Sequence, residues 1–184
     1  MRIRKLLRHP VTWVVLGIGA VAFGVALYLF QPWRLFTTVE VNEAPPAAVA
    51  ASQAPGASPA ATGGRPAGGP RELATGAFVS HEHDTAGTAR LLELADGSRV
   101  LRIEDLDTSD GPDLRVWLSD QPVKEGRAGW FNLDDGEHLE LGELKGNKGD
   151  ANYAVPAGAD LDSLKTVTIW CKRFSVSFGA AALA

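Results

Sequence analysis

The stretch TVTIWCKRFSVSF, at residues 166–178, decides the fold of this chain. Successive side chains of a β-strand point to opposite faces, so a strand with one buried face alternates apolar and polar residues. The two predicted faces of this strand carry Val167, Ile169 and Cys171 on one side and Thr168, Trp170 and Lys172 on the other. The pattern is typical of a β-strand, and it is the clearest one in the sequence.

The residues before this strand show the same alternation in shorter runs. The runs lie at residues 75–80, 87–94, 99–106, 112–119 and 153–156. The dipeptide Asp96-Gly97, between the second run and the third, is a strong hairpin signal. No segment after residue 33 sustains an apolar stripe of helical period. We therefore expect residues 73–184 to form an all-β domain, either an antiparallel β-sandwich or a barrel-like domain.

Residues 11–33 are mostly apolar and carry no charged side chain. A helix of that length rises about 34 Å, enough to cross a hydrocarbon core of about 30 Å. Basic residues precede it at Arg2, Arg4, Lys5 and Arg8. Because basic residues favour the cytoplasmic side, we expect a cytoplasmic tail at residues 1–10, a single transmembrane helix at residues 11–33 and an extracytoplasmic C-terminal domain at the cell membrane.

The competing interpretation of residues 11–33 is a cleaved signal peptide. Its apolar run is longer than the 7–15 residues that are usual for the core of a signal peptide. The sequence that follows, FQPWRLF at residues 30–36, also lacks the small residues that a cleavage site needs. These features favour an uncleaved anchor.

Residues 34–72 form the predicted linker between helix and domain. Within it, residues 44–70 consist almost entirely of Ala, Pro, Gly and Ser. Such a segment buries too little apolar surface to offset the entropy of ordering it, so we expect it to be disordered. It would act as a spacer that lifts the domain off the membrane.

The charge of the chain bears on its partners. The net charge is -4, and residues 71–184 carry twelve Lys and Arg residues against twenty Asp and Glu residues. An acidic domain repels phosphate backbones, which excludes nucleic acid as a partner. The remaining expected partners are the membrane, through the N-terminal helix, and a separate protein.

Cys171 is the only cysteine of the chain, in a domain predicted to face an oxidising compartment. It cannot form a disulfide within the chain, so it is an inert core residue, a redox-active thiol, a cofactor ligand or half of an intermolecular bridge. Its alternation with Val167 and Ile169 favours a position in the core.

The pair His81 and His83 is a second candidate site. Two histidines at this spacing on a strand point the same way and supply half of a metal site. No third ligand is evident, because His138 belongs to a separate loop. A solvated polar turn at the end of the first strand is the plainer interpretation, and we assign no metal site.

Five segments together resemble a known family. They are LRIEDL at 101–106, DGPDLRVWLS at 110–119, LGELKGN at 141–147, NYAVP at 152–156 and VTIWCKRF at 167–174. In this order they resemble the DM13 domain, and the resemblance spans roughly residues 76–183.

The resemblance implies a small β domain that takes part in electron transfer at cell surfaces. The hallmark cysteine of the family falls on Cys171, as a bare thiol or as the ligand of a prosthetic group such as haem. The expected function is a redox accessory module that acts with a separate redox or cell-envelope protein, rather than a stand-alone enzyme. The alternative is a non-catalytic binding domain of the cell envelope in which Cys171 only packs.

Overall fold

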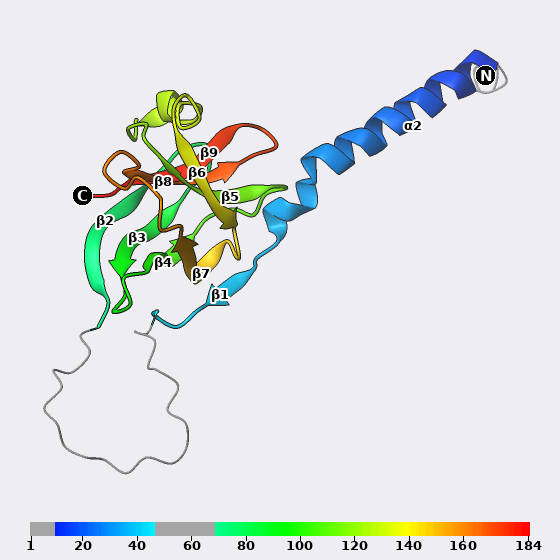
Figure 1. Cartoon of the computed structure of the whole chain (residues 1–184). Coiled ribbons are helices and arrows are strands. Elements are labelled where there is room, and N and C mark those ends of the chain that lie inside the picture. Colours follow the sequence, from blue (N-terminus) through cyan, green and yellow to red (C-terminus); the bar gives the residue numbers. More distant parts are fainter. Residues whose placement is uncertain (1–9, 47–68) are drawn as a thin grey trace, which may run out of the picture.

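The computed structural model describes residues 10–46 and 69–184 (Figure 1). The described chain begins with helix α2 (Pro10–Phe30) and the short 3-10 helix η1 (Pro32–Phe36). A second 3-10 turn, η2 (Gly126–Gly129), lies between β5 and β6. The strands are β1 (Glu40–Asn42), β2 (Arg71–Ser80), β3 (Ala86–Glu93), β4 (Arg99–Asp107), β5 (Leu114–Ser119), β6 (His138–Glu143), β7 (Lys148–Val155), β8 (Thr166–Cys171) and β9 (Val176–Ala182).

All nine strands belong to one strongly curled sheet, a half-barrel, in the order β1-β7-β4-β3-β2-β9-β8-β5-β6. Strand β2 turns the sheet, because its first part pairs with β3 and its last residues, Phe78 to Ser80, pair with β9. A register shift near its start adds to the bend. The prediction of a mostly β domain is confirmed. The strands form a single sheet rather than the two sheets of a sandwich. The sheet is mixed rather than antiparallel, since β1 pairs with β7 in parallel.

The main core fills the inside of the curl. Its fully buried side chains include Leu101, Ile103, Val116, Val167 and Ile169. A smaller cluster lies on the other face of the sheet and consists of Trp117, Leu133, Trp170 and Ala180. Every residue of β8 is therefore buried, on both faces of the strand.

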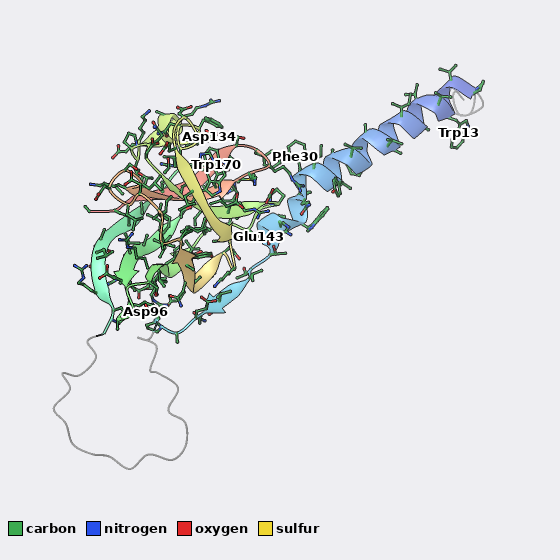
Figure 2. All side chains as sticks on the ribbon, in the orientation of Figure 1. Trp13, Phe30, Asp96, Asp134, Glu143 and Trp170 are labelled. Atoms are coloured by element: carbon green, nitrogen blue, oxygen red, sulfur yellow. The ribbon has the colours of Figure 1, made fainter. Side chains whose placement is uncertain are left out.

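Helix α2 extends away from the sheet, with Trp13 near its far end and Phe30 where it meets the domain (Figure 2). None of its side chains is buried. By length and composition the segment Pro10–Arg34 could cross a membrane, and a signal sequence near the N-terminus would look the same. The helix is therefore suited to be an anchor or a signal.

The segment after the helix differs from the linker that we expected for residues 34–72. Strand β1 adds Glu40 to Asn42 to the edge of the sheet beside β7. At the other end of the predicted linker, β2 begins at Arg71. The predicted disorder concerns mainly residues 47–68, which lie outside the described residues. Because β1 follows α2 so closely, the sheet lies next to the end of the helix rather than beyond a long spacer.

Candidate functional site

Cys171 is the last residue of β8, directly before the turn that leads into β9. Its strand neighbours are Leu114 in β5 and Val176 in β9. The side chain is fully buried in the main core, and the cysteine is not part of a disulfide. The inward orientation predicted from the alternation is confirmed.

The surroundings of the sulfur hold the thiol in its neutral form. Burial raises the pKa of Cys171, and the nearby charge of Asp113 acts in the same direction. Backbone hydrogen bonds from Phe174, Arg173 and Asp113 oppose this shift. Because the thiolate is the nucleophile and the metal-binding form, a buried thiol with a raised pKa is poorly reactive in this conformation.

The residues around Cys171 do not fit a haem that is ligated through sulfur. An axial ligand must face a cavity that admits the macrocycle. Cys171 lines none of the three pockets described among residues 10–46 and 69–184, and it is 0% exposed. A thiolate-bound haem would require the turn between β8 and β9 to open.

That turn contacts the end of helix α2. Arg173 donates hydrogen bonds to the carbonyl oxygens of Tyr28 and Leu29, at 3.2 and 3.1 Å. A cation is favourable there, because the last carbonyl groups of a helix lack partners and carry partial negative charge. The ring of Phe174 stacks on that of Phe30, with centroids 5.3 Å apart.

A second connection joins the chain after the helix to the loop before β5. Arg34 donates through Nη1 to an oxygen of Asp110 at 3.4 Å and to the carbonyl of Gly111 at 3.1 Å. Thr37 donates to the other carboxylate oxygen of Asp110 at 2.6 Å. We call residues 30–37, 110–113 and 172–175 together the helix-proximal end of the domain. This arrangement was not predicted from the sequence, although basic residues suited to a helix C-terminus follow Cys171.

An apolar pocket of about 540 Å³ opens at the helix-proximal end, and we call it the aromatic pocket. It is lined by Phe30, Gln31, Pro32, Arg34, Glu82, His83, Asp110, Gly111, Pro112, Trp130, Phe131, Phe174, Val176 and Phe178. Val176, the β9 neighbour of Cys171, forms part of its wall.

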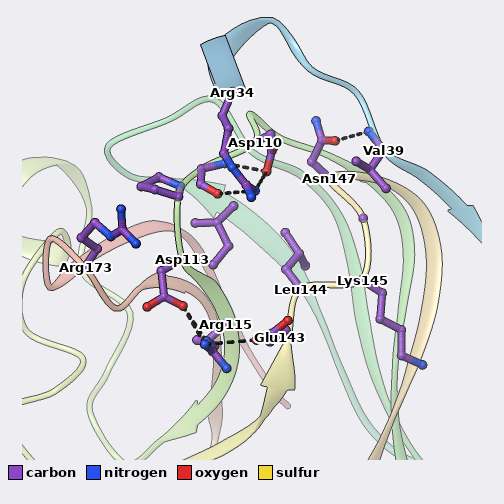
Figure 3. Close-up of a pocket in the computed structure, with 14 residues that line it drawn as sticks. Arg34, Val39, Asp110, Asp113, Arg115, Glu143, Leu144, Lys145, Asn147 and Arg173 are labelled. Atoms are coloured by element: carbon purple, nitrogen blue, oxygen red, sulfur yellow. Dashed lines mark hydrogen bonds and ion pairs between the residues drawn. The ribbon is translucent and has the colours of Figure 1, made fainter. Parts of the chain in front are cut away.

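A polar pocket of about 400 Å³ also includes residues 110–113 in its lining (Figure 3). Its charged side chains pair with one another, as Arg115 does with Asp113 at 2.8 Å and with Glu143 at 3.3 Å. Leu114, the β5 neighbour of Cys171, also lines this pocket. The thiol is therefore flanked by one residue from each of the two pockets.

The two histidines of the predicted turn have separate partners. His81 is buried, and its Nδ1 lies 2.8 Å from the hydroxyl oxygen of Ser177. His83 packs on the ring of Phe178, with centroids 3.9 Å apart, and its Nε2 contacts the carboxylate of Glu82. Because β2 ends at Ser80, strand alternation does not extend to these residues. A turn is present, but His81 is not solvated within it.

Among residues 10–46 and 69–184, no three His, Cys, Asp or Glu side chains lie together in a way that could hold a metal ion. His81 and His83 thus gain no third ligand from the described part of the fold.

The family model described as Electron transfer DM13 matches residues 77–183. No curated protein matches the chain. No solved structure matches it either. The family model covers more than half of the chain and includes Cys171, the aromatic pocket residues from Glu82 onward and every strand from β3 to β9, so the protein belongs to the DM13 family.

Proposed function

We propose that this protein is a membrane-anchored electron-transfer accessory module, with its N-terminus in the cytoplasm and its β domain outside. The membership in a family described by electron transfer supports the activity. The apolar helix and the basic residues before it support the anchor and its orientation. Cys171 is the proposed redox residue, as a thiol or, where the turn between β8 and β9 opens, as a cofactor ligand.

The observation that carries the role of Cys171 is its position at the helix-proximal end. Cys171 directly precedes the turn that contacts α2. Its strand neighbours Leu114 and Val176 line the polar pocket and the aromatic pocket, respectively. Burial raises the pKa of Cys171, and backbone hydrogen bonds from Phe174 and Arg173 oppose that shift only in part, so the thiol is neutral in the closed conformation. A movement of the turn at residues 172–175 would give the sulfur access to either pocket.

A second candidate function is a binding domain of the cell envelope in which Cys171 is structural. The complete burial of the side chain supports this alternative. A buried cysteine behaves as a small apolar side chain, and its neighbours here are core residues.

Protein-film voltammetry of the full chain in lipid nanodiscs tests both candidates. The electron-transfer proposal expects a redox wave in the wild type that disappears in Cys171→Ala. Val176→Ala is the matched control, because it truncates a core side chain next to the sulfur and keeps the thiol. A wild type without any wave refutes electron transfer. A wave that survives in Cys171→Ala makes the cysteine structural.

Protease treatment of intact cells tests the orientation. The proposed topology expects cleavage within residues 47–68 without lysis of the cells, detected as a shorter C-terminal fragment on a denaturing gel. Protection of those residues in intact cells, together with cleavage after lysis, would place the domain on the cytoplasmic side.

A further inference from the structure

The aromatic pocket combines three properties that together specify a class of ligand. It lies at the end of the apolar helix, four Phe side chains and Trp130 contribute to its walls, and its polar side chains include the imidazole–carboxylate pair of His83 and Glu82. We propose that it binds the ring of a membrane quinone, a flat lipid-soluble electron carrier. This inference rests on the proposed electron-transfer function, which selects a redox-active ring among lipid-soluble ligands.

The position of the pocket gives a ligand access from the bilayer. Phe30 is the last residue of α2, and Gln31 and Pro32, which follow it, also line the pocket. If α2 spans the membrane, these residues lie where the hydrocarbon core gives way to the headgroups. The cavity of about 540 Å³ falls within the range of about 300–1,000 Å³ that is usual for small-ligand sites.

The walls of the pocket suit a flat ring. Two ring pairs contribute to it: Phe30 stacks on Phe174, and His83 packs at a tilt against Phe178. Aromatic side chains favour offset stacking or edge contacts with another ring. Phe131 and Phe174 remain 47% and 40% exposed at its rim. Large apolar side chains gathered on a surface indicate a binding site.

The polar groups favour a quinone over the acyl chain of a phospholipid. His83 and Glu82 lie in contact on the wall and offer a hydrogen-bond donor and an acceptor. A quinone ring carries oxygen atoms at its edge that can accept a hydrogen bond, and the reduced form can also donate one. An acyl chain would leave these two side chains paired only with each other, whereas the oxygen atoms of a quinone offer them a further hydrogen-bond partner.

Binding is tested on the full chain in phospholipid nanodiscs, with decylubiquinone as the probe and quenching of tryptophan fluorescence as the signal. Trp130 lines the pocket and reports on occupancy. Quinone dissolved in the bilayer gives an unsaturable background, so a saturable component is expected for the wild type. Phe174→Ala should weaken that component about tenfold through loss of one stacking wall.

The matched control is Phe36→Ala, which removes an 88% exposed ring at the same end of the chain but outside the pocket. It should bind like the wild type. His83→Leu keeps a side chain of similar bulk and should also weaken binding about tenfold through loss of its hydrogen bond. Circular dichroism and thermal unfolding verify that each variant folds.

Three outcomes overturn the quinone site: no saturable quenching, equal affinity in Phe174→Ala and Phe36→Ala, or competition by decanol as strong as by the quinone. The last outcome would identify a site for apolar tails alone. Because binding is measured without electron exchange, these outcomes leave a wave in the voltammetry unaffected. The failure of the quinone site and the failure of electron transfer are therefore distinguishable.

Discussion

The side-chain oxygen of Asn147 accepts a hydrogen bond from the backbone N–H of Val39 at 2.7 Å. The amide nitrogen of the same side chain donates to the carbonyl of Thr108 at 2.8 Å. One buried side chain therefore joins the segment after the helix to the loop that follows β4. The DM13-like motif at residues 141–147 thus ends on a residue that holds the chain leaving α2.

Asn147→Ala should destabilise the domain by about 1–3 kcal/mol, because it leaves the buried carbonyl of Thr108 and the partly buried N–H of Val39 without this partner. Urea unfolding of the full chain in nanodiscs, followed by tryptophan fluorescence, measures this loss. Asn42→Ala is the matched control, since Asn42 is exposed and bonds only to Glu40. The control should change stability by less than about 0.5 kcal/mol. Equal stability of the two variants would contradict this role of Asn147.

Gly149→Ala should detach β1 from the sheet. Gly149 has a φ of 94°, which other residues rarely adopt, and a Cβ there would lie 2.3 Å from the carbonyl oxygen of Val41. The backbone N–H of Glu43, which donates to Asp150 at 2.9 Å, should then exchange its hydrogen much faster.

Hydrogen exchange followed by mass spectrometry measures that change. Gly158→Ala is the control, because a Cβ at Gly158 meets no atom within 4 Å. Unchanged protection of residues 40–43 in Gly149→Ala would show that β1 does not depend on this close approach.

The strands that the sequence predicts best are those with strict alternation. The hairpin at Asp96-Gly97 is present, with Gly97 at a φ of 82°. Strands β1, β6 and β9 were not predicted. β1 has three residues and only one apolar side chain, Val41, so its pairing depends on β7, which lies far along the sequence. β6 is an edge strand without a buried residue, and its pattern is weak for that reason.

The burial of Trp170 could not be read from local alternation. The sequence predicts that Trp170 faces away from the core side of β8, and it is only 1% exposed. Leu133 and Val123, from the long connection between β5 and β6, cover that face. The same limit applies to the aromatic pocket, because its walls come from five separate segments of the chain. Of these features, only the inward orientation of Cys171 could be predicted from the alternation of neighbouring residues.

Stability should fall as the pH drops below the ordinary pKa of histidine, about 6.5. Burial lowers the pKa of His81, and a backbone hydrogen bond with Lys124 opposes that shift only in part. The unfolded chain therefore binds a proton at a higher pH than the folded domain. The stability is fully present above about pH 6.5 and is lost as the pH falls towards the lowered pKa of the folded state.

Thermal unfolding of the full chain between about pH 5 and 8 measures this dependence. In His81→Gln the unfolding temperature should fall less between neutral and acid pH than in the wild type, although it should be lower than in the wild type at neutral pH. His138→Gln is the control, because His138 is exposed at the start of β6. If the wild type and His81→Gln lose the same number of degrees between neutral and acid pH, His81 is not the responsible group.

Arg173→Gln should loosen the contact between α2 and the domain without unfolding the sheet. The guanidinium of Arg173 donates to the carbonyl groups of Tyr28 and Leu29 and lies 5.9 Å from the ring centroid of Tyr28. Loss of these contacts leaves the helix end held mainly by Arg34 and by the Phe30–Phe174 stack. Trypsin should then cleave after Arg34 several-fold faster, because opening of a local segment precedes its proteolysis.

Lys172→Gln is the matched control for this cleavage. It removes one trypsin site from the same turn and one positive charge, and Lys172 pairs with Glu140 rather than with the helix. Cleavage after Arg34 should therefore be as slow in Lys172→Gln as in the wild type. If both variants are cleaved equally fast, general loss of charge at the turn explains the effect, and the two hydrogen bonds of Arg173 do not hold the helix to the domain.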